Sequence, residues 1–286
     1  MVLDDMLLVT ISCTCNDFKV NSARLRESIK NFSVCFDAEV YFYVIYQSKQ
    51  ADDDNEKALW SLLDGVQGSI INVEYLSVSG ARNQAISFSR SHDFTHLIFH
   101  DSSLIYSYDY LVWLKHNLSA DLLSTEFSFI DGFDFPSKLD GVLEKGVVFN
   151  DFVDLYVWSY CFNLKNKLPF FDERFGPGES SLFAAGEDFL FLREYFKRYP
   201  QHRRFLRYQG IGIIHPSRPL DYSKHLAYAE GQGKIHQIYL SEEKNLTAVF
   251  RCILFFGNSI FRVFMLRNNS LKIFALRVKG FLDRSV

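Results

Sequence analysis

The stretch "LIFHDSSLIY" (residues 97–106) begins like a buried strand and ends in one acid and two serines. Its first residues, 97–99, are large and apolar, which is typical of a strand covered on both faces. Asp101, Ser102 and Ser103 follow, and short polar residues at the carboxyl end of a strand often line a site. From this stretch alone, a weakened metal site, another kind of site and a simple turn all stay open.

Strand and helix patterns alternate through the first hundred residues. This alternation predicts an α/β fold in which helices cover both faces of a mostly parallel sheet. Such sheets bind ligands beyond the carboxyl ends of their strands, so residues 13–16, Gln47 and residues 101–103 should meet at one edge. The predicted strands are 7–12, 39–46, 70–76 and 95–100, and the predicted helices are 21–31, 55–63 and 79–91.

The pattern is less regular in the second half of the chain. A Gly- and Pro-rich loop precedes a helix that opens at Glu187, and the last clear strand ends at His215. The further predicted elements are the helices 108–117 and 187–199 and the strands 155–164 and 208–214.

Composition and charge divide the chain unevenly. Its 286 residues, 48% of them hydrophobic, suffice for one large domain, which we place at 1–240, with a tail at 241–286. Five cysteines show no disulfide-scaffold spacing, and the N-terminus carries acids where a signal peptide needs bases. We therefore expect a cytoplasmic protein with reduced cysteines.

Several common site motifs are absent from the sequence. There is no G-x-G-x-x-G, no P-loop, no H-E-x-x-H, no C-x-x-C and no G-x-S-x-G. These absences weigh against dinucleotide, P-loop, zinc and α/β-hydrolase chemistry. The basic run 197–209 lacks RNA-binding motifs and belongs to an acidic remainder, so we expect a solvated helix end and no nucleic-acid partner.

Two helix starts carry candidate functional groups. Arg82 stands in the first turn of the helix "SGARNQAISFSR" (79–90), where it could contact a phosphate or ribose, although an ordinary surface arginine fits as well. Glu187 and Asp188 open a later helix, where the macrodipole stabilises ionised carboxylates, although either acid could simply be a cap.

In their order along the chain, these motifs resemble the family 2 glycosyltransferases, inverting enzymes of the GT-A fold that build bacterial surface polysaccharides. The resemblance runs from about residue 7 to residue 233, most of the chain. Its segments are "SCTCN" (12–16), "ARNQAI" (81–86), Asp101-Ser102-Ser103 in the place of the D-x-D motif, "FGPGE" (175–179), "GEDF" (186–189), "IIHP" (213–216) and "YAEGQGK" (228–234).

The resemblance implies a role for each matching residue. Asp188 would be the general base that deprotonates an acceptor hydroxyl, and Glu187 would orient the acceptor or Asp188. This interpretation requires both acids to face Asp101 across a shared cleft. The resemblance also assigns Thr14, Asn16, Arg82, Asp101 and Ser103 to the nucleotide sugar, Gly178 and Glu179 to the acceptor, and Asp101 and His215 to a Mg²⁺ or Mn²⁺ ion.

Two departures from the family pattern affect the donor and the metal. Gln47 and Ser48 stand where the family usually has acids that hold the base, so the base is open, with a UDP-linked donor favoured. Ser103 is a weaker metal ligand than a carboxylate. A metal held by Asp101, His215 and the diphosphate is favoured over Lys/Arg stabilisation or lost activity, although a histidine before proline is often a packing residue.

The tail has a charge pattern of its own. Residues 245–286 carry seven Lys or Arg and a single acid, Asp283. We predict a helix at 270–284 that lies in the headgroup layer of an anionic membrane, against the alternative of a helical hairpin packed on the domain or on another subunit. Its apolar face is Leu271, Phe274, Val278, Phe281 and Leu282, and its flanking cations are Lys272, Arg277, Lys279 and Arg284. The longest uncharged run, Cys252–Phe261, has ten residues, too few to span a bilayer.

These predictions define an inverting glycosyltransferase, peripheral on the inner face of the cell membrane. It would move a sugar from a nucleotide sugar to a capsule or lipopolysaccharide glycan, free or lipid-linked, and a homo-oligomer stays open. The alternative is a catalytically silent GT-A domain that binds glycans or partner enzymes. A sugar nucleotidyltransferase is disfavoured because the first strand is not followed by a Gly-rich basic loop.

Overall fold

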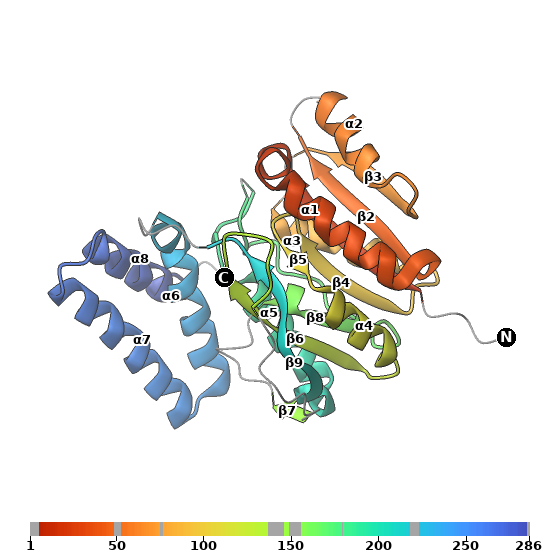
Figure 1. Cartoon of the computed structure of the whole chain (residues 1–286). Helices are drawn as coiled ribbons and strands as arrows, with labels where there is room; N and C mark the ends of the chain where they lie inside the picture. The colour runs from red at the N-terminus through yellow and green to blue at the C-terminus, as the bar shows by residue number, and fades with distance from the viewer. Residues whose placement is uncertain are drawn as a thin grey trace.

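The computed structural model describes residues 6–48, 53–74, 77–136, 146–148, 156–178, 180–217 and 223–284. Within them, nine strands form one sheet in the order β3-β2-β1-β4-β8-β6-β9-β5, and β7 pairs with β9 (Figure 1). The strands are β1 (Leu7–Thr14), β2 (Val40–Gln47), β3 (Gly68–Val73), β4 (His96–Asp101), β5 (Ile105–Tyr106), β6 (Leu122–Phe129), β7 (Gly146–Val148), β8 (Tyr160–Asn163) and β9 (Arg204–His215). The helices are α1 (Cys15–Phe36), α2 (Asp53–Leu62), α3 (Val78–Arg90), α4 (Tyr108–His116), α5 (Glu187–Arg198), α6 (Ser223–Glu243), α7 (Leu246–Phe264) and α8 (Ser270–Leu282).

The first four strands form a parallel half-sheet, as the sequence predicts. Across the sheet, their order is β3-β2-β1-β4. The chain adds β2 and β3 on one side of β1 and then adds β4 on the other side. The place between β1 and β4 is therefore the switch point at which α/β sheets bind ligands. In the register of the sheet, Ser12 lies beside Asp101 and Thr14 lies beside Gln47. The predicted meeting of these segments at one edge is therefore confirmed.

The second half of the sheet mixes strand directions. β8 runs antiparallel between β4 and β6, and β6 pairs in parallel with β9. Six of the nine described strands therefore share one direction, which confirms a mostly parallel α/β sheet. The predicted strand 155–164 is shorter, because a 3-10 turn at Val157–Ser159 precedes β8 and residue 155 lies outside the described residues. The sequence did not predict β5, β6 or β7.

Two apolar clusters cover the faces of the sheet. Side chains that alternate along each strand point to opposite faces. One set, with Val9 and Ile11, packs against α1, α2 and α4, and the other, with Leu8 and Phe99, packs against α3 and α5. The helix after β1 begins earlier and runs longer than predicted, from residue 15 to residue 36.

The helices α6, α7 and α8 form a layer beside the sheet (Figure 1, blue). Its glycines permit close backbone approach: a Cβ at Gly231 would overlap the carbonyl of Ala185, and one at Gly233 would overlap the carbonyl of Arg277. The helix α6 continues through residue 240, where we predicted that the tail begins. The division into domains remains a prediction.

The apolar surface of the tail lies mainly on α7. Arg277 of α8, predicted as a membrane-flanking cation, is buried and donates hydrogen bonds to Gln232 and Ser259, so that prediction is wrong. Because α8 packs against α6, its cations do not all surround one exposed face. The exposed residues of α7 and the turn after it include Leu246, Val249, Phe250, Ile253, Leu254, Ile260, Phe261, Phe264, Met265 and Leu266.

The uncharged-run argument about membrane spanning is also corrected. By length and composition, α7 could cross a membrane, and it is the one helix in the described part of the chain that could. The sequence analysis counted only the uncharged residues between Arg251 and Arg262. Both arginines lie inside α7, so the helix, with 19 residues, is longer than that run. Length and composition alone do not distinguish a spanning helix from one that lies on a surface.

Candidate active site

Arg82 lies at the centre of the site, buried beneath the first turns of α3. Ser77 caps this helix by accepting a hydrogen bond from the Gly80 N–H, and Arg82 projects from the face that packs on the sheet. Its side chain is 5% exposed, so the alternative of an ordinary surface arginine is wrong. The guanidinium donates to Asp188 Oδ1 at 2.5 Å and to Asp101 Oδ1 at 3.2 Å.

The acidic pair opens α5 as predicted, but neither acid is its N-cap. That position belongs to Gly186, in a left-handed conformation with φ 112° and without a side-chain cap. Asp188 accepts a hydrogen bond from the Val157 N–H at 3.2 Å through its second oxygen. Glu187 Oε1 lies 4.0 Å from Arg82 Nη1. Asp188 is therefore bound by a cation and an amide, and the capping interpretation does not hold.

Burial and mutual repulsion control the protonation of this pair. Burial, with the nearby Asp188 charge as a second cause, raises the pKa of Glu187 from its ordinary 4.5 to about 8. Burial also raises the pKa of Asp188, although Arg82 opposes the shift. Arg82 stays protonated, because the three carboxylates around it raise its pKa and outweigh its burial. A carboxylate whose pKa is raised is a stronger base once ionised.

Asp101 completes the cluster from the end of β4. Its side chain is 33% exposed, more than twice the 14% of either acid of α5. Arg82 lies between Asp101 and Asp188, so the predicted approach of the helix pair to the strand-four aspartate is present, with a guanidinium as the bridge. The shared cleft itself remains a prediction.

Ser103 and His215 lie together at the same edge. The Nδ1 of His215 is 2.8 Å from the carbonyl of Pro216, and its Nε2 is 3.4 Å from Ser103 Oγ. If Nδ1–H donates to that carbonyl, the lone pair of Nε2 faces Ser103. Burial lowers the pKa of His215, which favours the neutral ring that metal ligation needs. The ring also packs against Phe129 and Trp158, so the packing role that we considered is real.

These residues would supply only part of the ligands of a cation. The described residues contain no group of three or more His, Cys, Asp or Glu side chains placed to hold a metal. Asp101 and His215 supply a carboxylate and a neutral imidazole, and Ser103 supplies a hydroxyl. This set fits Mg²⁺ or Mn²⁺ where a diphosphate and water provide the other ligands, because such ions retain non-protein ligands.

The residues expected to hold the nucleotide lie at the same edge but are partly engaged. Thr14 is the N-cap of α1: its hydroxyl donates to Asp17 at 2.6 Å and accepts from the Asp17 N–H at 3.1 Å. Asn16 is exposed in the first turn of the same helix. Gln47 is buried, and its amide donates to Ser12 Oγ at 3.2 Å.

The predicted acceptor loop rests on the first turn of α3. The Val78 N–H donates to the carbonyl of Pro177 at 2.9 Å, and the Ser79 hydroxyl donates to the carbonyl of Phe175 at 2.5 Å. Gly178 is exposed with φ 145°, and Glu179 lies outside the described residues. The loop therefore contacts the helix that carries Arg82.

Arg24 is a site-supporting residue that the sequence analysis missed. From α1, its guanidinium donates to the backbone carbonyls of Ser103 at 2.7 Å, Gly132 at 2.6 Å and Ile214 at 3.1 Å. These carbonyls belong to segments far apart in the chain, and two of them adjoin Asp101 and His215. A mid-helix arginine carries no local signal of such a role, so only the fold reveals it.

The architecture is that of solved glycosyltransferase structures. No protein-family model and no curated protein matches the sequence. Residues 1–349 of S. aureus TarS in complex with UDP-GlcNAc match with a TM-score of 0.54 at 13% identity, covering 83% of this chain and 67% of that one. The same TarS fragment without that ligand gives 0.53 at 14% identity, and this chain spans 66% of it.

A second protein matches over nearly the whole chain. The mannosyltransferase PcManGT from Pyrobaculum calidifontis, in complex with GDP-Man and Mn²⁺, has a TM-score of 0.56 at 10% identity. The match covers 99% of this chain and 89% of that one, so it extends through the tail helices. At such low identity these likenesses establish the fold. The chain has the GT-A glycosyltransferase fold.

Proposed function

We propose that the protein is an inverting glycosyltransferase that uses a nucleotide sugar, as in family 2. The observation that carries this proposal is the cluster in which the buried Arg82 joins Asp188, on α5, to the partly exposed Asp101, at the end of β4. The cluster lies at the switch point of a GT-A sheet, where a nucleotide sugar would bind. Burying one cation with three carboxylates stabilises a fold poorly, so a catalytic use is the better explanation.

Asp188 is the proposed general base. It would remove the proton from an acceptor hydroxyl while that oxygen attacks the anomeric carbon and the nucleoside diphosphate leaves from the opposite face. One displacement of this kind inverts the anomeric centre. Glu187 would orient the acceptor or Asp188, and Gly178 and Glu179 would line the acceptor side.

Thr14, Asn16, Arg82, Asp101 and Ser103 are proposed to hold the nucleotide sugar. Asp101 and His215 would hold Mg²⁺ or Mn²⁺, and the ion would supply positive charge that stabilises the leaving diphosphate. The helix start of α1 presents backbone N–H groups at the same edge, which favours an anion there. We favour a UDP-linked donor.

The proposed acceptor is a capsule or lipopolysaccharide glycan, free or lipid-linked, at the inner face of the cell membrane. The support is the exposed apolar surface of α7, with Arg251, Arg262 and Arg267 near it and no acid in the helix. Such a surface favours an anionic lipid layer over water. The proposal places residues 245–286 on that membrane, and the same surface could serve a homo-oligomer.

A catalytically silent GT-A domain is the second candidate, a glycan-binding or scaffold component of an assembly complex. Two observations favour it. Arg82 already pairs with the proposed base, and the D-x-D position ends in Ser103. In that case the cluster would bind ligands without transferring a sugar.

One experiment separates these candidates. The purified protein is incubated with UDP-, GDP- and CMP-sugars, with and without Mn²⁺, and slow donor hydrolysis is measured. Hydrolysis that is lost in Asp188→Asn and retained in the exposed control Asp64→Asn supports the transferase. Nucleotide binding with no hydrolysis supports the silent domain, and the absence of any nucleotide binding contradicts the proposed donor site.

A further inference from the structure

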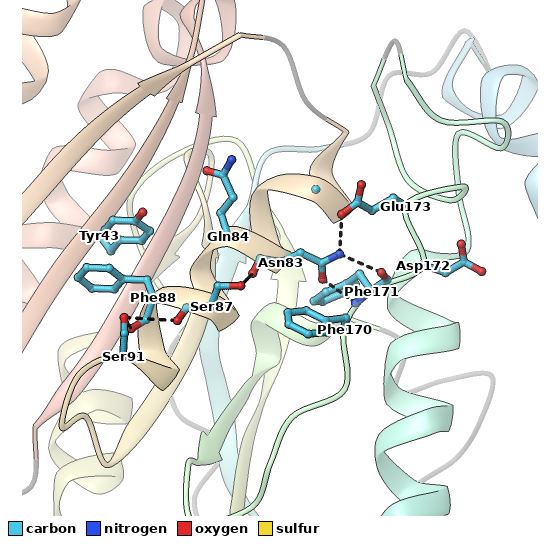
Figure 2. Close-up of a pocket in the computed structure, with 11 residues that line it drawn as sticks. Tyr43, Asn83, Gln84, Ser87, Phe88, Ser91, Phe170, Phe171, Asp172 and Glu173 are labelled. Carbon is cyan, nitrogen blue, oxygen red and sulfur yellow. Dashed lines mark hydrogen bonds between the residues drawn. The ribbon is translucent and has the colours of Figure 1, made fainter.

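A second concave surface lies on the outer side of α3, away from Arg82. It is a groove of about 1030 Å³ between the helix, β2 and the segment that leads into the acceptor loop (Figure 2). Figure 2 shows Tyr43 and Phe88 beside one another on one side of the groove and Phe170 and Phe171 on the other. None of the predicted catalytic or donor residues lines it.

The polar lining is fixed in place and partly unsatisfied. Asn83 donates to the Phe171 carbonyl at 3.0 Å and to Glu173 at 2.9 Å, and it accepts from the Phe171 N–H at 2.7 Å. Beside it, the side-chain oxygen of Gln84 is buried and has no hydrogen-bond partner among the described residues. A buried amide oxygen without a partner is costly, and a ligand hydroxyl would satisfy it once the Gln84 side chain turns toward the groove.

The apolar lining is aromatic and partly open to solvent. Phe170 is 49% exposed, and the Arg90 guanidinium lies 4.2 Å from its ring centroid. Tyr43 and Phe88 stack with ring centroids 3.9 Å apart, which makes that wall rigid. A sugar ring presents a face of C–H groups and a rim of hydroxyls, so it suits aromatic surface next to amides and carboxylates.

The charges around the groove favour a neutral ligand. Asp172 and Glu173 line it, and the lining residues within the described part of the chain include no lysine or arginine. The two neighbouring arginines are engaged: Arg174 with Asp172 at 2.6 Å, and Arg90 with the Leu168 carbonyl at 2.7 Å. A polyanionic chain would face the carboxylates of Asp172 and Glu173, and the nearby Arg174 is already paired with Asp172.

The groove begins where the acceptor loop meets α3. Gly80, which lines the groove, lies in the turn of α3 whose neighbours Val78 and Ser79 bond to the loop backbone. The 13 residues of α3 extend for about 20 Å at the usual rise of a helix, away from the active-site edge of the sheet. A chain whose end reaches the acceptor loop could therefore continue along the groove.

We infer that this groove is a distal subsite for a neutral oligosaccharide, the part of the acceptor already assembled. The role of the bound sugar as an acceptor rests on the proposed transferase function, whereas the binding of the sugar in the groove does not. Phe170 provides the stacking surface, and Gln84 and Asn83 provide the hydrogen bonds. The enzyme would then extend a neutral glycan chain in preference to a monosaccharide.

The test uses the full chain and a panel of neutral tetra- to hexasaccharides of glucose, xylose, mannose or N-acetylglucosamine. An oligogalacturonate of equal length is the anionic probe. Saturation-transfer NMR reports which sugars bind, and calorimetry gives Kd. We expect at least one neutral probe to bind, and the anionic probe to bind at least tenfold more weakly. Phe170→Ala and Gln84→Ala should each weaken binding about tenfold, and Trp60→Ala, a comparably exposed aromatic on α2, should not.

Ser87→Trp would fill the groove from the exposed side of α3 and should abolish binding. Because it adds a side chain at an exposed position, it tests the groove even if one of the other variants misfolds. Failure of every neutral probe to bind, or binding that survives Phe170→Ala and Ser87→Trp, overturns the inference. A parent protein that hydrolyses donors but binds no oligosaccharide refutes the groove alone. One that binds oligosaccharides through the groove but hydrolyses no donor refutes the transferase alone.

Discussion

Two regions of the molecule reverse the usual distribution of side chains, and they do so in opposite ways. At the sheet edge, Arg82 is a buried cation, and the ionisable side chains of Glu187 and Asp188 beside it are only 14% exposed. On α7, residues such as Phe261 and Phe264 are apolar groups that lie in solvent, 61% and 77% exposed. Folded proteins avoid both arrangements unless something compensates for them.

The compensation differs between the two regions. The charged groups at the sheet edge pair with one another, so their mutual contacts offset the free energy lost when they leave water. The exposed face of α7 has nothing packed against it in the described part of the chain, so its compensation must come from outside. Charged groups that are paired away from water indicate a catalytic or binding site. An uncovered apolar face indicates contact with a lipid layer or with another molecule.

The largest expected effect is on catalysis at the buried region. Asp188→Asn keeps the shape of the side chain and its contact with Val157 but cannot accept the acceptor proton. We expect the rate of sugar transfer to fall by about 10²–10⁴-fold, the usual contribution of a general base. Initial rates with a saturating donor measure this, with Asp64→Asn as the control. An unchanged rate would mean that another group is the base.

Arg82→Met tests whether the buried charges depend on one another. The substitution leaves Asp188 and Glu187 buried without their cation, so the free energy of unfolding should fall by about 3–5 kcal/mol at neutral pH. Urea denaturation followed by circular dichroism measures it. Part of the loss should be recovered at pH 5, where Asp188 takes up a proton more readily, whereas Glu187, whose pKa is raised to about 8, already holds a proton at neutral pH. An equal loss in Arg26→Met, an exposed arginine of α1, would argue against a special role.

The exposed region predicts lipid binding that apolar side chains control. Replacing both Phe250 and Phe261 by Ser removes two large groups from the α7 face. At about 1.5 kcal/mol or more for each buried side chain, vesicle affinity should fall about 100-fold. Sedimentation with vesicles containing anionic lipid measures this, and Trp60→Ser with Phe133→Ser is a control of similar exposure outside the tail. If the parent protein does not bind vesicles but forms dimers, and the double variant is monomeric, this face contacts a second copy of the chain instead.

Arg24→Lys tests whether Arg24 supports the backbone beside the candidate site. A lysine keeps the charge but cannot reach three carbonyls in separate directions, so at least one carbonyl loses a charged hydrogen bond. We expect the free energy of unfolding to fall by about 1.5–3 kcal/mol. KM for the donor should rise several-fold with kcat nearly unchanged, because Arg24 holds the backbone beside Asp101 and His215. A change confined to stability would make Arg24 a purely structural residue.

The sequence predicts these two regions to different extents. The strands β1 to β4 were predicted to within three residues at each end, because buried parallel strands are short apolar runs with polar ends. Asp188 and Asp101 were predicted as site residues from the order of the motifs, and the structure brings both of them to Arg82. Their bridge through Arg82 was not predicted, since the pairing joins residues 106 positions apart. Membrane contact was predicted for residues 245–286 with the face at 270–284 as its clearest part, whereas the exposed apolar surface lies mainly on α7. Periodicity identifies an apolar face but not which of two helices packs inward.

A pH dependence links function to stability at the Glu187–Asp188 pair. The pKa of Glu187 is raised in the folded protein, from 4.5 to about 8, so between these values the folded state holds a proton that the unfolded state has released. Its contribution to stability is therefore complete below about pH 4.5 and is lost as the pH rises toward 8. Ionisation of Asp188, which catalysis needs, increases in the same direction, so activity should rise with pH while stability falls, by at most about 1.4 kcal/mol per pH unit. Unfolding free energies and kcat/KM measured from pH 5 to 9 test this, with Glu187→Gln expected to flatten the stability slope and Glu194→Gln, exposed on the same helix, expected to leave it. A stability that does not fall over this range in the parent would show that the pair is ionised throughout, and the raised pKa of Glu187 would then be contradicted.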